Sequence, residues 1–349
     1  MALASTPAHR IRGITTCVPG RVFDNTKDAT AFTAKEVDAV VKMVGVKQRR
    51  MADDSVCSSD LCRVAAQDLL RRLDWDPATV GALVLVTQSP DYFQPSSACV
   101  LQERLGLPDT CAAFDVGLGC SGYTYGLWLA GMMLRDSDIS RVLLLHGETP
   151  TRFCDPTDRS VGLLFGDAGS ATAIEAAGPA DATGSDRWWF SLHTDGTGAS
   201  DLIIEAGGFR DRFAQDPRRH FLNMNGANIM NFTLKRVPPL VEATLAAAGT
   251  VAADIDYFVL HQSNQFIMRH LAKKCSIPLE RMPLTLDRFG NTGGPSVPLT
   301  LTQGGLQRPE DRALRLLLLA YGVGLSWGSA LVHLPPNAQL NHLEYPSDE

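Results

Sequence analysis

Three polar residues of this 349-residue chain have the chemistry of a covalent catalytic site, and Cys120 is the most informative of them. Cys120 follows a strand-like run at 112–116 and precedes an apolar, helix-like run at 121–134. A thiol at a helix N-terminus meets partial positive charge and free N–H groups, which favour the nucleophilic thiolate. We therefore predict that Cys120 is a nucleophile activated at neutral pH.

His261 and Asn291 supply complementary groups. His261 directly follows the apolar strand-like run 257–260, and the carboxyl ends of strands are where α/β proteins bind ligands. Asn291 lies in a glycine-rich turn, 288–298, that opens a helix, where a neutral amide can donate a hydrogen bond without titrating. Each also has an ordinary interpretation, as a surface-loop histidine and as a turn-forming asparagine.

A glycine-rich run at 321–328 would let backbone N–H groups approach a ligand closely, although it could also be a tight strand connection. With Cys120, His261 and Asn291 it completes the set needed for thioester chemistry: nucleophile, imidazole, amide donor and oxyanion hole. Leu118 occupies the first glycine position of a G-x-S-x-G elbow, which disfavours an α/β-hydrolase. The local signature of papain-like proteases is also missing around Cys120.

The elements that must position these residues alternate between strand-like and helix-like runs, which predicts an α/β architecture with buried sheets. The predicted strands are 82–86, 112–116, 142–145, 170–175, 257–260, 314–319 and 326–334, and the predicted helices are 59–73, 97–105, 122–134, 228–248 and 264–275.

A polar, Gly/Ala/Asp-rich run at 177–186 indicates a linker near the midpoint, so we predict two halves, 1–180 and 181–349. The halves resemble each other weakly. Residues 83–89 can be laid on 257–263, and the Gly-Ser-Ala at 169–171 matches that at 328–330. Such short matches also arise by chance, so by themselves they leave internal duplication open.

Composition narrows the class of protein. A hydrophobic content of 45% allows a large core, and a net charge of -6 argues against a general nucleic-acid binder, although local basic patches remain possible. Eight cysteines without paired C-x-x-C spacing favour a reducing cytoplasm. Residues 1–12 have no signal-peptide core and the apolar stretch 125–134 is too short to span a bilayer, so we expect a soluble protein without membrane association.

At this point the sequence resembles the β-ketoacyl-acyl-carrier-protein synthase III family of the thiolase superfamily, over nearly the whole chain. The motifs that carry the resemblance, in family order, are Ala113-Phe114-Asp115, Gly119-Cys120-Ser121-Gly122, Cys154-Asp155-Pro156-Thr157-Asp158-Arg159, Phe165-Gly166-Asp167, His261-Gln262-Ser263-Asn264, Gly290-Asn291-Thr292 with Ser296-Val297-Pro298, and Ser326-Trp327-Gly328-Ser329-Ala330. The resemblance implies a duplicated thiolase fold in five αβαβα layers, a homodimer, and an active site between the halves.

The resemblance also implies roles for individual residues. Cys120 would attack the thioester of an acyl primer, with the N–H groups of Cys120 and Gly324 as the oxyanion hole. His261 and Asn291 would hold the thioester carbonyl of a malonyl carrier while it loses carbon dioxide. No metal or redox cofactor is implied, and acyl-coenzyme A or an acyl carrier protein would bring the substrate.

The substrate-binding positions match less completely. Arg159, Gly226 and Asn264 agree with positions that the family uses for coenzyme A. Ala39 and Met43 stand where the family has a tryptophan and an arginine around the adenine, so that clamp is absent or rebuilt from other residues.

The positions at which the family docks the carrier also match only in part. Phe266 and Asn231 replace a family arginine and lysine, while Arg269, Lys273 and Lys274 keep a basic patch that would suit an acidic carrier or be an ordinary solvated helix face.

Two alternative functions therefore stay open beside condensation. One is transfer of the acyl group to a hydroxyl or amine, and the other is a non-catalytic subunit that keeps the fold. The length and branching of the primer also stay open, as does the choice between fatty acid synthesis and specialised metabolism.

Overall fold

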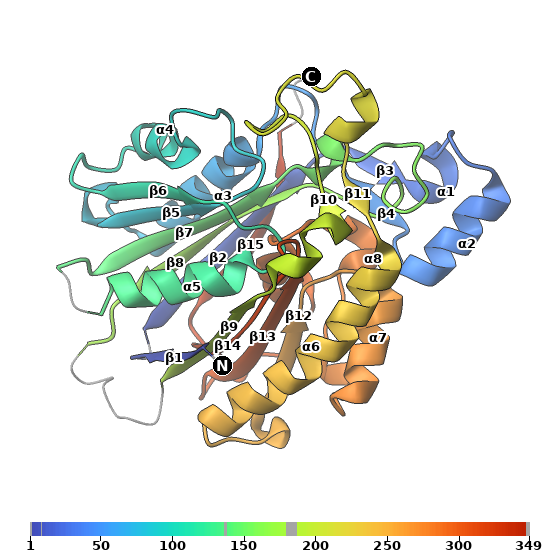
Figure 1. Cartoon of the computed structure of the whole chain (residues 1–349). Helices are drawn as coiled ribbons and strands as arrows, with labels where there is room; N and C mark the ends of the chain where they lie inside the picture. Colours follow the sequence, from blue (N-terminus) through green and yellow to red (C-terminus); the bar gives the residue numbers. More distant parts are fainter. Residues whose placement is uncertain (1, 8, 136–137, 179–186, 347–349) are drawn as a thin grey trace.

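Two β-sheets organise the computed structural model, which describes residues 2–7, 9–135, 138–178 and 187–346 (Figure 1). The six-stranded sheet has the order β15 (Gln339–Tyr345), β2 (Arg10–Pro19), β8 (Ala168–Glu175), β7 (Arg141–Glu148), β5 (Ala82–Val86) and β6 (Ala112–Val116). The five-stranded sheet has the order β1 (Ala2–Thr6), β9 (Trp188–Thr194), β14 (Ser326–Leu334), β13 (Leu314–Gly322) and β12 (Tyr257–Leu260).

Helices cover both faces of both sheets, because each central strand is apolar on its two sides. Along β5, Val84 and Val86 face a core shared with the other sheet, whereas Leu83 and Leu85 face outward-lying helices. Such burial on both faces is typical of parallel α/β sheets. The long helices are α3 (Ser58–Leu73), α4 (Ser97–Arg104), α5 (Gly122–Met133), α6 (Gly226–Ala247), α7 (Gln265–Lys274) and α9 (Ser296–Gln303).

The three largest apolar clusters define the layers. α3 and α4 pack on the outer face of the six-stranded sheet, and α6 and α7 pack on the outer face of the five-stranded sheet. α5 and α9 contribute Leu127, Ala130, Val297 and Leu301 to the core that lies between the sheets. The order is helix, sheet, helix, sheet, helix, which confirms the predicted five-layer thiolase fold.

The two halves share one topology. In the order β2-β8-β7-β5 the neighbours pair antiparallel, antiparallel and parallel, and β9-β14-β13-β12 repeats this pattern. The weak sequence matches fall on equivalent strands: 83–89 in and after β5 against 257–263 in and after β12, and 169–171 in β8 against 328–330 in β14. The duplication that short matches left open is thus visible in the strand order.

The chain ends cross between the halves. β1, at the N-terminus, pairs with β9 in the five-stranded sheet, and β15, near the C-terminus, pairs with β2 in the six-stranded sheet. The predicted boundary between 180 and 181 lies outside the described residues, and most of the predicted linker does as well. The division into 1–180 and 181–349 therefore stays a prediction.

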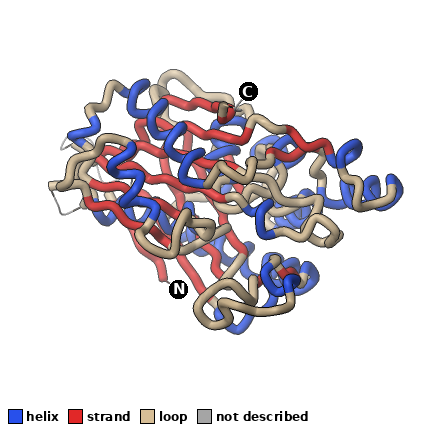
Figure 2. Tube along the Cα trace, turned by 90° about the horizontal axis from the view of Figure 1, so that it is seen from above, coloured by secondary structure: helices blue, strands red, loops and turns tan. Residues whose placement is uncertain are grey.

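The remaining elements complete the fold, which Figure 2 shows from above. They are β3 (Val22–Asp24) paired with β4 (Gln48–Arg50), β10 (Leu202–Ile203) paired with β11 (Asn223–Met224), and the helices α1 (Asn25–Asp28), α2 (Ala34–Val44) and α8 (Leu286–Phe289). All eight cysteines are free thiols. Within the described part of the chain, no helix has both the length and the apolar character needed to cross a membrane.

Candidate active site

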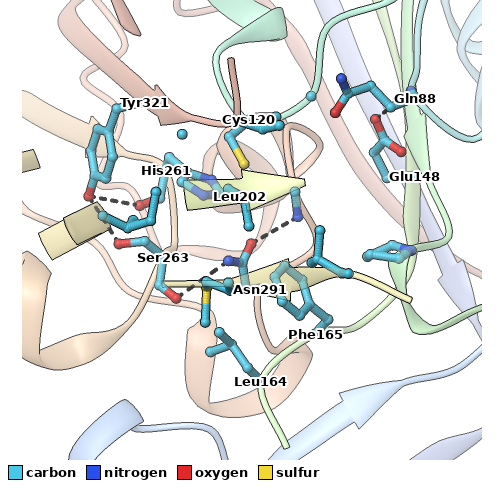
Figure 3. A pocket seen from close by; sticks show the side chains of 18 of the residues that line it. Gln88, Cys120, Glu148, Leu164, Phe165, Leu202, His261, Ser263, Asn291 and Tyr321 are labelled. Atoms are coloured by element: carbon cyan, nitrogen blue, oxygen red, sulfur yellow. Dashed lines mark hydrogen bonds between the residues drawn. The ribbon is translucent and has the colours of Figure 1, made fainter. Parts of the chain in front are cut away.

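One cavity of about 360 Å³ collects the residues that the sequence singled out (Figure 3). Its polar lining comes from several strand ends and turns and includes Cys120, His261 and Asn291. Most of the remaining wall is apolar. The apolar side chains are Pro150, Phe153, Leu164, Phe165, Leu202, Ile203, Ile204, Leu222, Met224, Ile229, Ile267 and Val323.

Cys120 lies between β6 and α5, as predicted, and the turn is closed by the Gly122 N–H, which donates to the Gly119 carbonyl at 2.8 Å. Ser121, the residue that caps α5, has its hydroxyl 2.6 Å from the hydroxyl of Ser326 on β14. This contact ties the nucleophile's turn to the other half of the molecule. Cys120 itself is partly accessible, so a substrate in the cavity can reach it.

The thiol is not the preformed thiolate that the helix position predicts. Burial raises the pKa of Cys120 to about 11, and the backbone N–H groups of Val323 and Cys120 lower it only in part. Desolvation disfavours the charged form and here outweighs the helix terminus. Cys120 therefore starts the reaction as a neutral thiol, and its proton must leave as the sulfur attacks.

The backbone contact at the thiol comes from Val323, one residue away from the predicted oxyanion donor Gly324. Val323 lines the cavity and its backbone lies within hydrogen-bonding reach of the Cys120 sulfur, whereas Gly324 is not among the lining residues. The close approach depends on Gly322, where a Cβ would lie 2.7 Å from the sulfur. This contact concerns the sulfur and does not test which N–H groups meet a substrate carbonyl, so the N–H groups of Cys120 and Gly324 stay the predicted oxyanion donors.

His261 is held at the carboxyl end of β12. Its N–H donates to the Leu319 carbonyl at 2.7 Å, and its Nδ1 lies 2.8 Å from the Ser296 hydroxyl at the start of α9. The ring meets Tyr321 edge to face at 5.6 Å. Burial lowers the pKa of His261 to about 4, against an opposing hydrogen bond with the Gly293 backbone, so the imidazole is neutral at neutral pH.

Asn291 is oriented by its own turn. Its Oδ1 accepts from the Gly293 N–H at 2.9 Å, and Nδ2 is 3.5 Å from the Ser263 carbonyl, at the limit of a hydrogen bond. The main chain is fixed to the other half, because the Asn291 N–H donates to the Leu164 carbonyl at 2.9 Å. With Oδ1 occupied, the side chain offers a substrate its N–H₂ group, as the sequence predicts for a neutral donor.

Sequence reasoning missed two further residues that line the cavity, Gln88 and Glu148. Glu148, at the end of β7, is 3% exposed and accepts from the Gln88 N–H at 2.8 Å and from the Ser89 hydroxyl at 2.9 Å. Burial raises the pKa of Glu148 to about 8, against the two hydrogen bonds. No motif in the sequence singles out either residue. Among the described residues, no group of three or more His, Cys, Asp or Glu side chains could hold a metal ion.

The predicted substrate-binding residues divide into two groups. Gly226, the first residue of α6, and Asn264, whose side chain accepts from the Ile267 N–H at 2.8 Å to cap α7, both line the cavity. Arg159 does not line it; its guanidinium is exposed and lies 3.5 Å from the Glu36 carboxylate. Ala39 and Met43, on α2, are both exposed.

The predicted carrier-docking residues share one helix. Arg269, Lys273 and Lys274 are exposed on α7, whose other face packs on the five-stranded sheet. Phe266, at the start of the same helix, is 45% exposed, and its ring centroid lies 4.2 Å from that of His270 with the two rings tilted. The placement leaves this surface open to a partner and does not identify one.

These features define a class of protein. Five layers built from two like halves, with a thiol from one half and an imidazole and amide from the other around a largely apolar cavity, are the arrangement of a thiolase-fold enzyme that works on thioesters.

Comparison with known proteins places the chain within that class. Residues 114–196 match the family description 3-oxoacyl-(acyl-carrier-protein) synthase III, and residues 245–334 match its C-terminal counterpart. A putative 3-oxoacyl-(acyl-carrier-protein) synthase 3 from Campylobacter jejuni is 32% identical over 97% of this chain and 98% of its own. A β-ketoacyl-(acyl-carrier-protein) synthase III from Xanthomonas campestris is 33% identical over 93% and 97%.

Solved structures agree. A 3-oxoacyl-(acyl-carrier protein) synthase from Burkholderia xenovorans LB400 is 41% identical, with a TM-score of 0.93 over 98% of this chain and 99% of that one. The chain belongs to the β-ketoacyl-acyl-carrier-protein synthase III family of condensing enzymes.

Proposed function

We propose that this enzyme loads an acyl primer on Cys120 and condenses it with a malonyl carrier to give a β-ketoacyl thioester. The observation that supports this most directly is the single cavity on which Cys120, His261 and Asn291 converge from the two halves. The substrates, acyl-coenzyme A or an acyl carrier protein, are inferred from family membership, as is a homodimer.

In the first half-reaction, the Cys120 sulfur attacks the carbonyl carbon of the primer thioester. The carbon–sulfur bond to the incoming carrier breaks, and the carrier thiol leaves with the proton that Cys120 gives up. The charge that develops on the carbonyl oxygen needs preorganised donors. The N–H groups of Cys120 and Gly324 would supply them, because Gly322 lets the strand connection that carries Gly324 approach the sulfur.

In the second half-reaction, the malonyl thioester loses carbon dioxide and becomes an enolate. The neutral imidazole of His261 and the Nδ2 group of Asn291 donate hydrogen bonds to the thioester oxygen, which carries the developing charge. The enolate carbon then attacks the acyl carbon on Cys120. The new carbon–carbon bond forms as the carbon–sulfur bond breaks, and the released Cys120 thiolate takes up a proton.

Intact-protein mass spectrometry combined with carbon dioxide release tests the proposal. The protein is incubated with a panel of acyl-coenzyme A and acyl-carrier thioesters, and malonyl carrier is then added. We expect the mass of one acyl group on Cys120, followed by its loss with carbon dioxide release. Cys120→Ala should carry no acyl mass and form no β-ketoacyl product, even where it still releases carbon dioxide from the malonyl carrier, whereas Cys99→Ala, which removes an exposed thiol elsewhere, should behave as the wild type.

The outcomes separate the alternatives. An acylated Cys120 without carbon dioxide release would contradict condensation and support transfer to a hydroxyl or amine. Failure of every thioester to acylate Cys120 would contradict both enzymatic functions. Light scattering in solution tests the homodimer, which requires twice the 37.7 kDa mass of the chain.

A further inference from the structure

The Gln88 side chain is a polar group in the cavity that the proposed reaction does not use. Gln88 follows β5 and lines the cavity together with Gly119 and Cys120. Figure 3 shows its carboxamide pointing toward Cys120. The carboxamide lies against Gly119, the neighbour of Cys120, because a Cβ added at residue 119 would collide with the Gln88 Oε1. No described residue makes a hydrogen bond to this carboxamide, so both its donor and its acceptor are available to a ligand.

The backbone of Gln88 is held firmly even though its carboxamide is free. Its N–H donates to Glu148 Oε1 at 2.8 Å, and the neighbouring Ser89 hydroxyl donates to Glu148 Oε2 at 2.9 Å. Ser89 in turn accepts from the Thr149 N–H at 3.1 Å. This network fixes where the Gln88 side chain begins, next to Gly119 and Cys120, while the side chain itself is exposed. Glu148 is thus a positioning residue for Gln88.

The two substrates have different sides of Cys120 available to them. His261 and Tyr321 lie on one side of the thiol in Figure 3, and Gln88 and Glu148 lie on the other. If His261 and Asn291 hold the carbonyl of the malonyl carrier, as the proposed function states, the acyl group bonded to Cys120 extends away from them. Its first carbons then lie beside Gln88.

We propose that Gln88 selects acyl primers that carry a hydroxyl or carbonyl oxygen on carbon 3, in preference to plain alkyl primers. This inference rests on the proposed acylation of Cys120. A plain alkyl chain beside Gln88 displaces water from the carboxamide and returns no hydrogen bond, whereas an oxygen at carbon 3 replaces the lost partner. A site built for a hydrogen bond discriminates against the analogue that lacks it.

A competition experiment measures this preference. 3-Hydroxybutyryl and butyryl thioesters of the same carrier are mixed in equal amounts, and the initial rates of Cys120 acylation are read by intact-protein mass spectrometry. We expect the wild type to favour the hydroxylated primer by about tenfold, the size of one net hydrogen bond. Running the pair once on coenzyme A and once on a carrier protein separates primer choice from carrier choice.

Variants at residue 88 identify the source of the preference. Gln88→Leu and Gln88→Met keep bulk but remove the hydrogen-bonding group, and in both the ratio should fall to about one. The matched control Gln67→Leu, on the exposed face of α3, should keep the wild-type ratio.

Each other outcome overturns the inference. A wild-type ratio near one, or an unchanged ratio in both residue-88 variants, would show that Gln88 does not select the primer, while Cys120 acylation would still support the proposed function. If neither primer nor any other thioester acylates Cys120, the proposed function fails together with the inference.

Discussion

The loops that follow β5 and β12 are equivalent positions of the duplicated fold. They share one pattern of hydrogen bonds but carry different side chains toward the cavity. In the loop after β5, the Ser89 hydroxyl donates to the Glu148 carboxyl at the end of β7. In the loop after β12, the Ser263 hydroxyl lies 3.1 Å from the Tyr321 hydroxyl at the end of β13. A serine bonded to the neighbouring strand thus fixes both loops.

The glutamines of the two loops differ most. Gln262 is 1% exposed, its amide donates to the Leu260 carbonyl at 2.9 Å, and its Oε1 accepts from the Thr285 N–H at 3.0 Å. Gln88, its counterpart, is exposed and leaves its carboxamide without a partner in the described chain. The Gln262 side chain therefore stabilises the fold, whereas the Gln88 side chain makes no such bond and faces the cavity.

The preceding residue shows the same divergence. His261 stands directly after β12, and Thr87 stands at the equivalent place after β5, where its hydroxyl accepts from the Ser89 N–H at 3.0 Å. One half therefore uses this position for the imidazole that we propose to be catalytic, and the other uses it for local structure.

Replacing the residue at this position should give the largest effect and should do so in one half only. In His261→Ala we expect condensation to fall about 10²–10⁴-fold, the usual contribution of a positioned imidazole, while Cys120 acylation persists. Carbon dioxide release and intact-protein mass are measured on the same samples. Thr87→Ala, the matched variant, should retain decarboxylation. If His261→Ala also lost acylation, His261 would have to take the proton from Cys120 as well.

The two glutamines should separate in stability. Gln262→Leu removes the acceptor of the Thr285 N–H and the donor to Leu260, and leaving such buried groups unpaired should lower the free energy of unfolding by about 3 kcal/mol. Gln88→Leu should change it by less than about 0.5 kcal/mol, because no intramolecular hydrogen bond to the carboxamide is lost. Urea unfolding of both variants measures the difference. Equal losses would show that Gln88 is also structural.

How far the sequence predicted these regions depends on how local their determinants are. The strands 82–86 and 257–260 were predicted with their observed bounds, because an unbroken apolar run flanked by polar residues marks a buried strand. β1 and β15 were missed, since their partners lie in the opposite halves of the chain and no local pattern reveals that exchange.

The site shows the same limit. Cys120, His261 and Asn291 could be named from motifs, but the pKa of Cys120 could not be predicted, since burial by both halves outweighs the local helix terminus. Which backbone group meets the sulfur depends on how the β13–β14 connection turns at Gly322, and glycine content alone does not specify that turn. Gln88 and Glu148 carry no motif, and only their convergence in the cavity reveals them.

The Glu148 carboxyl, which lies at the end of β7 and bonds to the loop after β5, should make stability depend on pH. The pKa of Glu148 is raised to about 8, so the folded state holds a proton that the unfolded state has released, and stability falls as pH rises from about 4.5 to 8. Buried histidines act in the opposite direction between pH 6.5 and 8, because burial lowers the pKa of His261 and His146 to about 4 and 3 whereas an unfolded histidine still loses about half a proton over this interval. The contribution of Glu148 is therefore the difference between the wild type and Glu148→Gln, which share these histidines.

From pH 6.5 to 8 the unfolding free energy of the wild type should fall by about 2 kcal/mol relative to that of Glu148→Gln. Urea unfolding of both proteins at pH 6.5 and pH 8 measures this difference. The same change with pH in both proteins would contradict a protonated Glu148.

The smallest effect should come from the Tyr321 hydroxyl at the end of β13, which contacts the loop after β12 as Glu148 contacts the loop after β5. Tyr321→Phe removes the contact with Ser263 at 3.1 Å and a longer one to the His261 carbonyl at 3.4 Å, but keeps the ring against His261. We expect a loss of about 1 kcal/mol. This loss should be the same at pH 6.5 and pH 8, because burial raises the pKa of Tyr321 above its usual range and the phenol stays neutral throughout. A Tyr321→Phe loss that grew with pH would mean that a titrating group also lies beside the loop after β12, and the contrast between a carboxyl beside one loop and a neutral phenol beside the other would then be wrong. A constant loss, together with a pH-dependent effect of Glu148, would place the titration beside the loop that carries Gln88.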